Sequence, residues 1–321
     1  MFYKMKAEQS HRAWEFWRKF GEKPICLAPM AEVNDLAFRI LCRNHGIRVC
    51  YTGMINAIQW CQGKRYQTRV FNTSCEDRPL IVQLAGSNHD SLLAAAKDIS
   101  QYCDAIDINL GCTQHIAKRG GYGFFMVDTE EKRDSVIELF KKLVKEVPIP
   151  ITAKIRVFTD SEGNSDENLT VNFAKRLQAA GVYIVEVHGR FQMRNKKADV
   201  ATSIIKRAVD ELDIPVVANG GVLSKEDADK LFELTGSAGV MVGQALLSDP
   251  TIFDKEKHSL KEFSTEYLQI AMKFPDINFF CPRKHIFTFF TDMIKQKPGI
   301  EKEIQESETY DDLLNFVNKY T

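Results

Sequence analysis

Short, uninterrupted apolar runs alternate with amphipathic stretches over most of the chain. Because the runs are apolar throughout rather than alternating, they predict parallel strands that are covered on both faces. Eight runs are expected to be strands: Ile25–Met30, Val49–Thr52, Leu80–Leu84, Ala105–Asn109, Ile151–Ile155, Tyr183–His188, Pro215–Asn219 and Gly239–Val242. Apolar residues at spacings of three and four predict helices between them, at Ser91–Tyr102, Glu130–Lys145, Leu169–Ala180, Ala201–Leu212 and Lys225–Leu234.

Eight strand–helix units in about 225 residues predict an α/β fold of the (β/α)8 TIM barrel type. A doubly wound sheet stays open as an alternative, because periodicity does not show whether a sheet closes on itself. The stretch Ala13–Phe20 is expected to form a helix that covers the barrel.

The strand pattern stops after Asp249-Pro250. Apolar residues from Phe263 to Phe274 then share one helical face, and Pro282, at an expected first helical position, is predicted to open a second helix. We therefore expect a covering helix at 1–20, a barrel domain at 21–250 and a small all-helical domain at 251–321.

Charge narrows the classes of partner. The chain has 321 residues, with 43 basic and 43 acidic side chains and a net charge of zero. Binding of a polyanion through bulk charge is therefore not expected, and a nucleic-acid site requires local basic clusters. The candidate clusters are Lys64-Arg65 with Arg69, Lys118-Arg119, Arg194 with Lys196-Lys197, and Arg283-Lys284.

The spacing of the cysteines and the hydropathy of the chain indicate in which cellular compartment the protein is expected. The eight cysteines are irregularly spaced and form no C-x-x-C pair, which argues against a zinc ribbon and favours reduced thiols. Charged residues interrupt the first 20 positions, and no run of 18 apolar residues occurs. The sequence predicts a cytoplasmic protein without membrane or metal, leaving a nuclear pool open; a monomer is expected.

Polar or glycine residues follow the predicted strands with unusual regularity. They are Met30, Thr52, Gln83, Asn109, Lys154, His188, Asn219 and Gly243. Chemistry in a barrel takes place on the face where the strands end. One such residue is explained by turn formation, but a nearly complete ring indicates a functional site.

Each member of the ring has more than one interpretation. Asn219-Gly220-Gly221 and Gly243 suit a phosphate site after strands seven and eight, or ordinary turns. Lys154 suits an electron-rich cofactor ring, a salt bridge, or a Schiff base. His188 could donate to phosphate or be structural, and Gln83 could bind the amide edge of a heterocycle or cap its strand.

Cys112 is the cysteine with a chemical interpretation. It follows Asn109-Leu110-Gly111 in a glycine-bearing loop that continues to Arg119-Gly120-Gly121-Tyr122-Gly123. Thiols are mostly protonated at neutral pH, which suits a general acid that donates to a carbanion-like centre. The glycines suggest that the loop is a lid.

With these motifs in order over about 220 residues, the sequence resembles the tRNA-dihydrouridine synthase family. The resemblance rests on Ala28-Pro29-Met30-Ala31, Asp35–Arg39, Gln83, Asn109–Cys112, Lys154-Ile155-Arg156, His188-Gly189-Arg190, Asn219-Gly220-Gly221 and Met241-Val242-Gly243. Tyr51–Ala57, Gln114–Ala117, Tyr122-Gly123 and Arg283–Phe287 further resemble the eukaryotic branch that acts on D-loop uridines 16 and 17. Thr113, where the family usually has proline, and Gln244 depart from the family pattern.

The resemblance implies an FMN-dependent barrel enzyme with a helical tRNA-binding domain. By analogy, FMN would contact Pro29, Met30, Ala31, Gln83, Lys154, His188, Asn219, Gly220, Gly221, Gly243 and Gln244. NADPH or NADH would reduce the flavin, hydride would pass to uridine C6, and Cys112 would protonate C5. Substrate contacts would come from Asn109, Arg156, Arg190, Arg283 and Lys284.

Three other functions fit parts of the sequence. A flavin-dependent reductase of free pyrimidines would share the ring of residues but would not need the helical domain. A non-catalytic RNA-binding protein on the same scaffold would need neither Cys112 nor a cofactor. A phosphate-binding aldolase or isomerase would be colourless and would give Cys112 no role.

Overall fold

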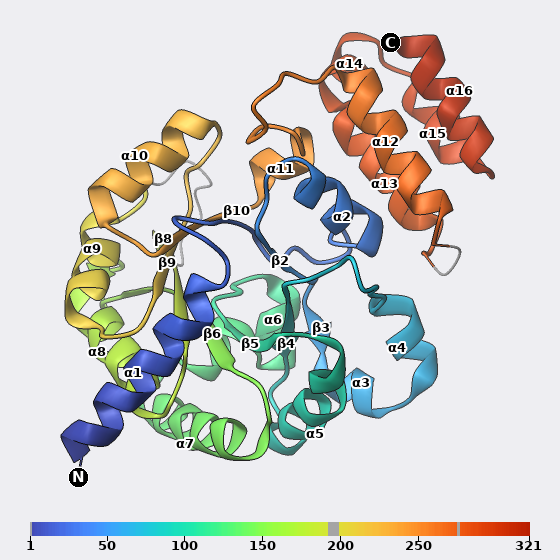
Figure 1. Ribbon diagram of the computed structural model, residues 1–321. Coiled ribbons are helices and arrows are strands. Elements are labelled where there is room, and N and C mark those ends of the chain that lie inside the picture. Colours follow the sequence, from blue (N-terminus) through green and yellow to red (C-terminus); the bar gives the residue numbers. More distant parts are fainter. Residues whose placement is uncertain (1, 192–198, 275–276) are drawn as a thin grey trace.

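The computed structural model describes residues 2–191, 199–274 and 277–321. Eight parallel strands form its centre (Figure 1). They are β1 (Ile25–Leu27), β2 (Val49–Tyr51), β4 (Leu80–Ala85), β5 (Ala105–Leu110), β6 (Ile151–Thr159), β8 (Ile184–Phe191), β9 (Val216–Asn219) and β10 (Gly239–Val242). Because β2 pairs with β4 and β1 pairs with β10, the sheet closes. The predicted TIM barrel is confirmed, and an open, doubly wound sheet is excluded.

Helices cover the outside of the barrel. They are α2 (Leu36–Asn44), α3 (Ala57–Cys61), α4 (Lys64–Val70), α5 (His89–Ile99), α6 (His115–Gly120), α7 (Glu130–Glu146), α8 (Glu167–Ala179), α9 (Thr202–Glu211), α10 (Lys225–Thr235) and α11 (Gln244–Ser248), with 3-10 turns at Ser100–Tyr102 and Gly123–Met126. Several long helices start at a side chain that accepts a backbone N–H three residues later, as Thr129 does for α7 and Asp166 for α8.

Some predicted boundaries are wrong for local reasons. The first strand ends at Leu27 rather than Met30: the N–H of Ala28 still donates to Val242, but Pro29 has no N–H to continue the ladder. The strand at 151 runs on to Thr159, where a short strand, β7 (Ser165–Asp166), pairs with it in antiparallel register. The two-residue strand β3 (Ile55–Asn56) beside β4 was not expected either.

The inside of the barrel is layered from bottom to mouth. Toward the amino ends of the strands the interior is apolar, with Cys26, Val49, Ile81, Ala105, Ile184 and Val217 packed together. Trp17 and Phe20 close this end from below. Trp17 belongs to α1 (Phe2–Arg18), and its indole N–H donates to the carbonyl of Ala238 at 3.1 Å. The predicted covering helix is present; it begins well before Ala13 and ends at Arg18, two residues before Phe20.

Among the described residues, five helices follow the barrel, and the first of them packs against α2 (Figure 1). They are α12 (Leu260–Met272), α13 (Phe280–Phe289), α14 (Thr291–Gln296), α15 (Glu301–Glu306) and α16 (Tyr310–Tyr320). Pro282 is the third residue of α13 and not its first, so the predicted start of that helix is wrong. Proline is tolerated there because the N–H groups of the first turn have no partner within the helix. The domain boundary at 250 stays a prediction.

One set of buried side chains joins these helices to the barrel. His285 of α13 is fully buried, and its Nε2 lies 2.8 Å from a carboxylate oxygen of Asp35, the residue that caps α2. Its ring stacks on Phe38 with centroids 4.4 Å apart. The hydroxyl of Tyr267 in α12 is 3.4 Å from both oxygens of Asp35.

A second set lies at the other end of α2. Both ring nitrogens of His45 are 2.7 Å from a carboxylate oxygen, of Asp254 and of Glu266 in α12. His258 lies 2.8 Å from the same Asp254 oxygen. These three groups, His45, Asp254 and His258, are the ligand types of a metal site, but tetrahedral zinc ligands lie about 3.3 Å apart. Separations of 2.7 and 2.8 Å are those of hydrogen bonds.

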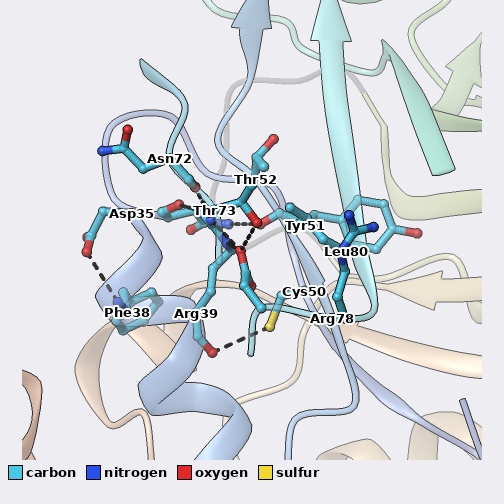
Figure 2. Close-up of polar contacts among 12 residues, drawn as sticks. Asp35, Phe38, Arg39, Cys50, Tyr51, Thr52, Asn72, Thr73, Arg78 and Leu80 are labelled. Carbon is cyan, nitrogen blue, oxygen red and sulfur yellow. Dashed lines mark hydrogen bonds and ion pairs between the residues drawn. The ribbon is translucent and has the colours of Figure 1, made fainter. Parts of the chain in front are cut away.

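A buried ion pair fixes the loop before β4 against α2 (Figure 2). The guanidinium of Arg39 donates to one oxygen of Asp77 from Nε at 2.9 Å and from Nη2 at 2.6 Å. The same group donates to the carbonyls of Asn34 and Asn72. Asp77 is fully buried and Arg39 nearly so. Removing Asp77 therefore leaves the Arg39 charge without this partner, whereas Asp77 also pairs with Arg43 at 3.4 Å.

In the described part of the chain, none of the helices has the length and the apolar composition needed to cross a membrane.

Candidate active site

A cavity of about 650 Å³ opens at the end of the barrel where the strands finish. This volume is within the range of small-molecule and cofactor sites. Of the residues singled out from the sequence, it is lined by Pro29, Met30, Ala31, Gln83, Asn109, Cys112, Lys154, Arg156, His188, Arg190, Asn219, Gly220, Gly221, Gly243, Gln244 and Lys284. Thr52 of the predicted ring and Arg283 of the predicted substrate contacts do not line it. Barrel closure and the packing of α13 against the barrel therefore bring together residues that are up to 255 positions apart, Pro29 and Lys284.

Lys154 forms the floor of the cavity together with Asn219. The Lys154 ammonium donates to the Asn219 side-chain oxygen at 2.8 Å, and the Asn219 amide donates to the carbonyl of Met241 at 2.8 Å. Asn219 is a neutral partner, so this contact is not the salt bridge that the sequence left open. Burial, followed by the nearby Arg156 charge, lowers the pKa of Lys154 to about 8.

Positive charge gathers on one side of the mouth. Arg156 donates from Nε to the carbonyl of Gly111 at 2.9 Å and from Nη1 to the carbonyl of Arg190 at 3.0 Å. Burial lowers the pKa of Arg156 to about 10. Burial and the charges of Lys154, Arg156 and Arg190 lower the pKa of His188 well below its usual value. At neutral pH His188 is an uncharged imidazole that can donate one N–H.

The loop carrying Cys112 is held from both sides. The Asn109 side-chain oxygen accepts the N–H groups of Gly111 at 3.1 Å and of Cys112 at 3.0 Å. The carbonyl of Cys112 accepts from the N–H of Phe124 at 3.0 Å. Asn109 therefore orients the thiol loop, whether or not it also contacts a substrate.

Gly123 touches the same loop at close range. A Cβ on Gly123 would lie 2.7 Å from the Cys112 carbonyl oxygen and 2.9 Å from the Cys112 Cβ. Gly123 also has a φ of +67°, a conformation that glycine adopts without strain. Two requirements, close approach and positive φ, thus demand glycine at this position.

The glycines after β9 leave the backbone open to a ligand. Gly220 and Gly221 have φ values of +121° and +76°. A Cβ on Gly220 would lie 3.1 Å from the His188 ring, and one on Gly221 would lie 2.9 Å from Val200. The absence of side chains here exposes N–H groups, which is the property of a phosphate-binding loop.

Sequence analysis did not single out the carboxyl groups beneath the cavity. Asp107 and Glu186 are fully buried inside the barrel, and Gln83, also fully buried, donates to Asp107 at 2.7 Å. Asp107 and Glu186 each stand two residues before a predicted site residue, Asn109 and His188. Since side chains alternate along a strand, that spacing places them on the inward face and could have identified them.

The basic clusters are placed differently from one another. Lys64, Arg65 and Arg69 are exposed on α4, and Lys118 and Arg119 are exposed on α6, next to the Cys112 loop. Lys284 lines the cavity and lies 3.1 Å from Glu32.

Arg283 belongs to the predicted RNA surface but does not line the cavity. The guanidinium of Arg283 is directed within the helical domain, to the carbonyl of Gln305 at 3.1 Å and over the Phe279 ring. Arg194, Lys196 and Lys197 lie outside the described residues.

Known proteins of similar sequence show which family the chain belongs to. The chain is 33% identical over 311 residues to a rat protein named tRNA-dihydrouridine(16/17) synthase [NAD(P)(+)]-like, covering 93% of this chain and 67% of that one. It is 35% identical over 275 residues to the Schizosaccharomyces pombe tRNA-dihydrouridine(16/17) synthase [NAD(P)(+)], covering 81% and 66%. The chain thus spans about two thirds of the length of these relatives.

Among solved structures, a 2-naphthoyl-CoA reductase complex superimposes with a TM-score of 0.55 at 10% identity, covering 71% of this chain and 49% of the other. This likeness supports the barrel fold and nothing further. The family model described as dihydrouridine synthase (Dus) matches residues 26–310. That match includes nearly the whole barrel, the Cys112 loop and most of the helical domain, and the chain belongs to the dihydrouridine synthase family.

Proposed function

We propose that this chain is a flavin-dependent tRNA-dihydrouridine synthase that uses NADPH or NADH and FMN. The observation that carries the proposal is the convergence of the predicted cofactor residues and Cys112 on one cavity. The names of the two relatives supply the reaction and the electron donor.

The residues of the cavity fit FMN in three respects. The volume of about 650 Å³ accommodates a ligand of that size. Gly220, Gly221 and His188 offer backbone and imidazole N–H groups suited to a phosphate. The Lys154 ammonium at the floor suits a ring that gains negative charge on reduction. When bound, FMN would supply hydride transfer from the nicotinamide donor to C6 of uridine.

The residues of the chain contribute to the reaction in two ways: Cys112 donates a proton, and its neighbours hold the loop that carries it. The Cys112 thiol donates a proton to C5, forming the second C–H bond of dihydrouridine, and its thiolate is then reprotonated from solvent. Asn109 and Gly123 fix the loop that presents this thiol. Arg156 ties that loop to β6 through the carbonyl of Gly111.

The substrate must be a uridine that has left the base stack, because a stacked base offers no free face to a cofactor ring. We propose that the exposed basic side chains of α4 and α6 and Lys284 bind the tRNA backbone around such a base. With the 16/17 specificity in the names of the relatives, the proposed targets are uridines 16 and 17 of the D-loop.

The test is a two-step anaerobic titration of the purified protein. NADPH is expected to bleach a yellow flavin spectrum, and unmodified tRNA is then expected to restore it. Mapping dihydrouridine along the product tRNA identifies the position. If a free pyrimidine such as uracil restores the oxidised flavin spectrum and tRNA does not, the result supports the small-molecule reductase instead. A colourless protein that cannot be reconstituted with FMN would leave the RNA-binding protein or the aldolase.

We further propose a cytoplasmic monomer. All eight cysteines are free, as expected in a reducing compartment. Light scattering of the purified chain and the distribution of a fluorescent fusion in cells test the two parts; a dimer, or an exclusively nuclear signal, contradicts the corresponding part.

A further inference from the structure

Two carboxyl groups lie inside the barrel directly below the cavity, and the proposed reaction assigns neither of them a role. Asp107 is on β5 and Glu186 is on β8, and both side chains are fully buried. The β6–β8 register pairs Glu186 with Lys154, so these two side chains stand next to each other on the inward face. The β5–β6 register pairs Asn109 with Lys154, which places Asp107 one layer lower.

The hydrogen bonds of the two carboxyl groups differ in kind. Each oxygen of Asp107 accepts from a neutral donor, Gln83 at 2.7 Å and Thr152 at 2.9 Å, an arrangement that suits a carboxylate. One oxygen of Glu186 accepts from the Tyr51 hydroxyl at 2.6 Å. The other oxygen, Oε2, is buried and has no donor among the described residues.

A proton on Glu186 resolves this arrangement. Asp107 and Glu186 flank β6 on its two sides, opposite Thr152 and Lys154 of the same inward face. A hydrogen bond with Glu186 is among the causes that lower the pKa of Asp107, and a protonated Glu186 is the partner that can donate it. Burial raises the pKa of both groups, and the charge of Asp107 raises that of Glu186 further. When two carboxyl groups share a buried site, one of the two pKa values is strongly raised.

We propose that Asp107 and Glu186 share one proton and act together as a positioning pair that supplies a single negative charge beneath Lys154. The pair keeps the Lys154 ammonium charged in a site whose burial opposes charge. The other titratable groups that act on this interior are Cys26 on β1, Tyr51 on β2, and Arg156, His188 and Cys112 above.

The charge of Lys154 at neutral pH depends on this compensation. The pKa of Lys154 is about 8 with the pair in place. An opposite charge at this range shifts a pKa by about 1–3 units. Without it, Lys154 would lose its proton below neutral pH, and the floor of the cavity would become uncharged.

The proposal is tested by replacing first Glu186, and then both Asp107 and Glu186, by neutral amides and measuring the effect on the titration of Lys154. The readout is the pH titration of the Lys154 ¹³Cε resonance in lysine-labelled full-length protein, assigned by its loss in Lys154→Arg. Glu186→Gln is expected to leave the midpoint nearly unchanged, because Asp107 keeps the single charge. The double variant Asp107→Asn/Glu186→Gln is expected to lower it by about 1–3 pH units. Glu266→Gln, a carboxylate substitution at the domain junction, is the control and should leave it unchanged.

Two results overturn the proposal. A drop in Glu186→Gln alone, with a second drop in the double variant, means that both carboxyls are ionised. No shift in either variant means that both are neutral. If the double variant does not fold, infrared spectroscopy decides: Glu186→Gln must lose one protonated-carboxyl band at neutral pH, and its retention refutes the shared proton.

These measurements need neither flavin nor tRNA, so their failure is distinguishable from failure of the proposed function. The consequence for catalysis does rest on that function. In FMN-loaded protein, the double variant is expected to have a more negative flavin reduction potential than the wild type, while Glu186→Gln stays near the wild-type value. A purely structural role for the pair would not produce this order of reduction potentials. An equal potential in all three proteins would contradict the proposed effect of the pair on the flavin.

Discussion

Substituting Gly123 by alanine tests whether the position of the Cys112 loop limits uridine reduction. A Cβ at Gly123 would lie 2.7 Å from the carbonyl oxygen of Cys112, and the φ of Gly123 is +67°. Gly121, two residues earlier, has a φ of +65°, but a Cβ there would meet only the Ser87 Cβ at 3.5 Å. Gly121→Ala is therefore a matched control that shares the backbone cost and lacks the clash.

The expected magnitudes follow from these distances. Alanine in the left-handed conformation costs about 1–2 kcal/mol in either variant. In Gly123→Ala the Cys112 carbonyl must also move from 2.7 Å to an ordinary contact at 3.4 Å, a shift of 0.7 Å. Overpacking of this kind adds about 1–3 kcal/mol. Because misplacing a reacting group by about 1 Å can cost 10²-fold in rate, we expect uridine reduction to slow by about 10- to 100-fold.

The assay separates the two half-reactions. Urea unfolding gives the free energy of unfolding of each variant. Stopped-flow mixing of NADPH-reduced protein with unmodified tRNA gives the rate of flavin re-oxidation, and mixing oxidised protein with NADPH gives the rate of flavin reduction. Flavin reduction should be unchanged in both variants, since neither glycine lies in the predicted FMN contacts.

The comparison with Gly121→Ala decides the outcome. If both variants re-oxidise with tRNA at the same rate, the contact between Gly123 and Cys112 does not control the chemistry, and our account of the loop is wrong. Equal stability of the two variants would show that the Cys112 loop relaxes without cost.

Three further predictions concern other parts of the molecule. Cys112→Ala should keep FMN and NADPH oxidation but nearly abolish dihydrouridine formation, measured in the product tRNA. Asp77→Ala should lower the free energy of unfolding by about 3–5 kcal/mol in urea melts, because it leaves the buried Arg39 charge unpaired. Hydrogen bonds from His45 to Glu266 and then Asp254 raise the His45 pKa; its stabilisation should be complete below about pH 6.5 and be lost as pH rises through the raised value.

Each of these has a contradicting result. Parallel loss of FMN and activity in Cys112→Ala would make the thiol structural. A loss below about 1 kcal/mol in Asp77→Ala would mean that water reaches Arg39. For His45, the urea midpoint is compared between pH 5.5 and pH 9 with His45→Gln as the control, and an equal pH slope in both proteins removes His45 as the cause.

The sequence was sufficient for the barrel because its strands are buried on both faces. Runs such as Leu80–Leu84 and Gly239–Val242 can be nothing but core strands or short buried helices, and their number and spacing select the barrel. The predicted strand ends were wrong where something other than hydrophobicity ends or extends the strand. Pro29 has no N–H to continue β1, and pairing with β7 extends β6.

The site was predictable where it follows the strand ends and not where it depends on closure. Lys154, His188 and Asn219 each end an apolar run, so their shared face could be deduced. His45 and Glu266 are 221 residues apart, and no spacing rule connects them. The spacing places Glu186 and Asp107 on inward faces, but it does not show that these two residues of different strands act on each other.

The closure of the barrel has a consequence for how the chain is made. Strand β1 pairs on one side with β10, and the Trp17 indole that seals the bottom of the barrel binds a carbonyl 221 residues later. Ribosomes add about 5–20 residues each second, so one edge of β1 and the aromatic face of α1 wait roughly 10–45 s for their partners.

During that interval the nascent barrel is an open sheet with an unpaired strand edge and an exposed Trp17–Phe20 face. Such surfaces bind other unfinished chains. Pairing of β10 with β1 is the step that removes this open edge. Slow translation before residue 242 would prolong its exposure to aggregation and to chaperones.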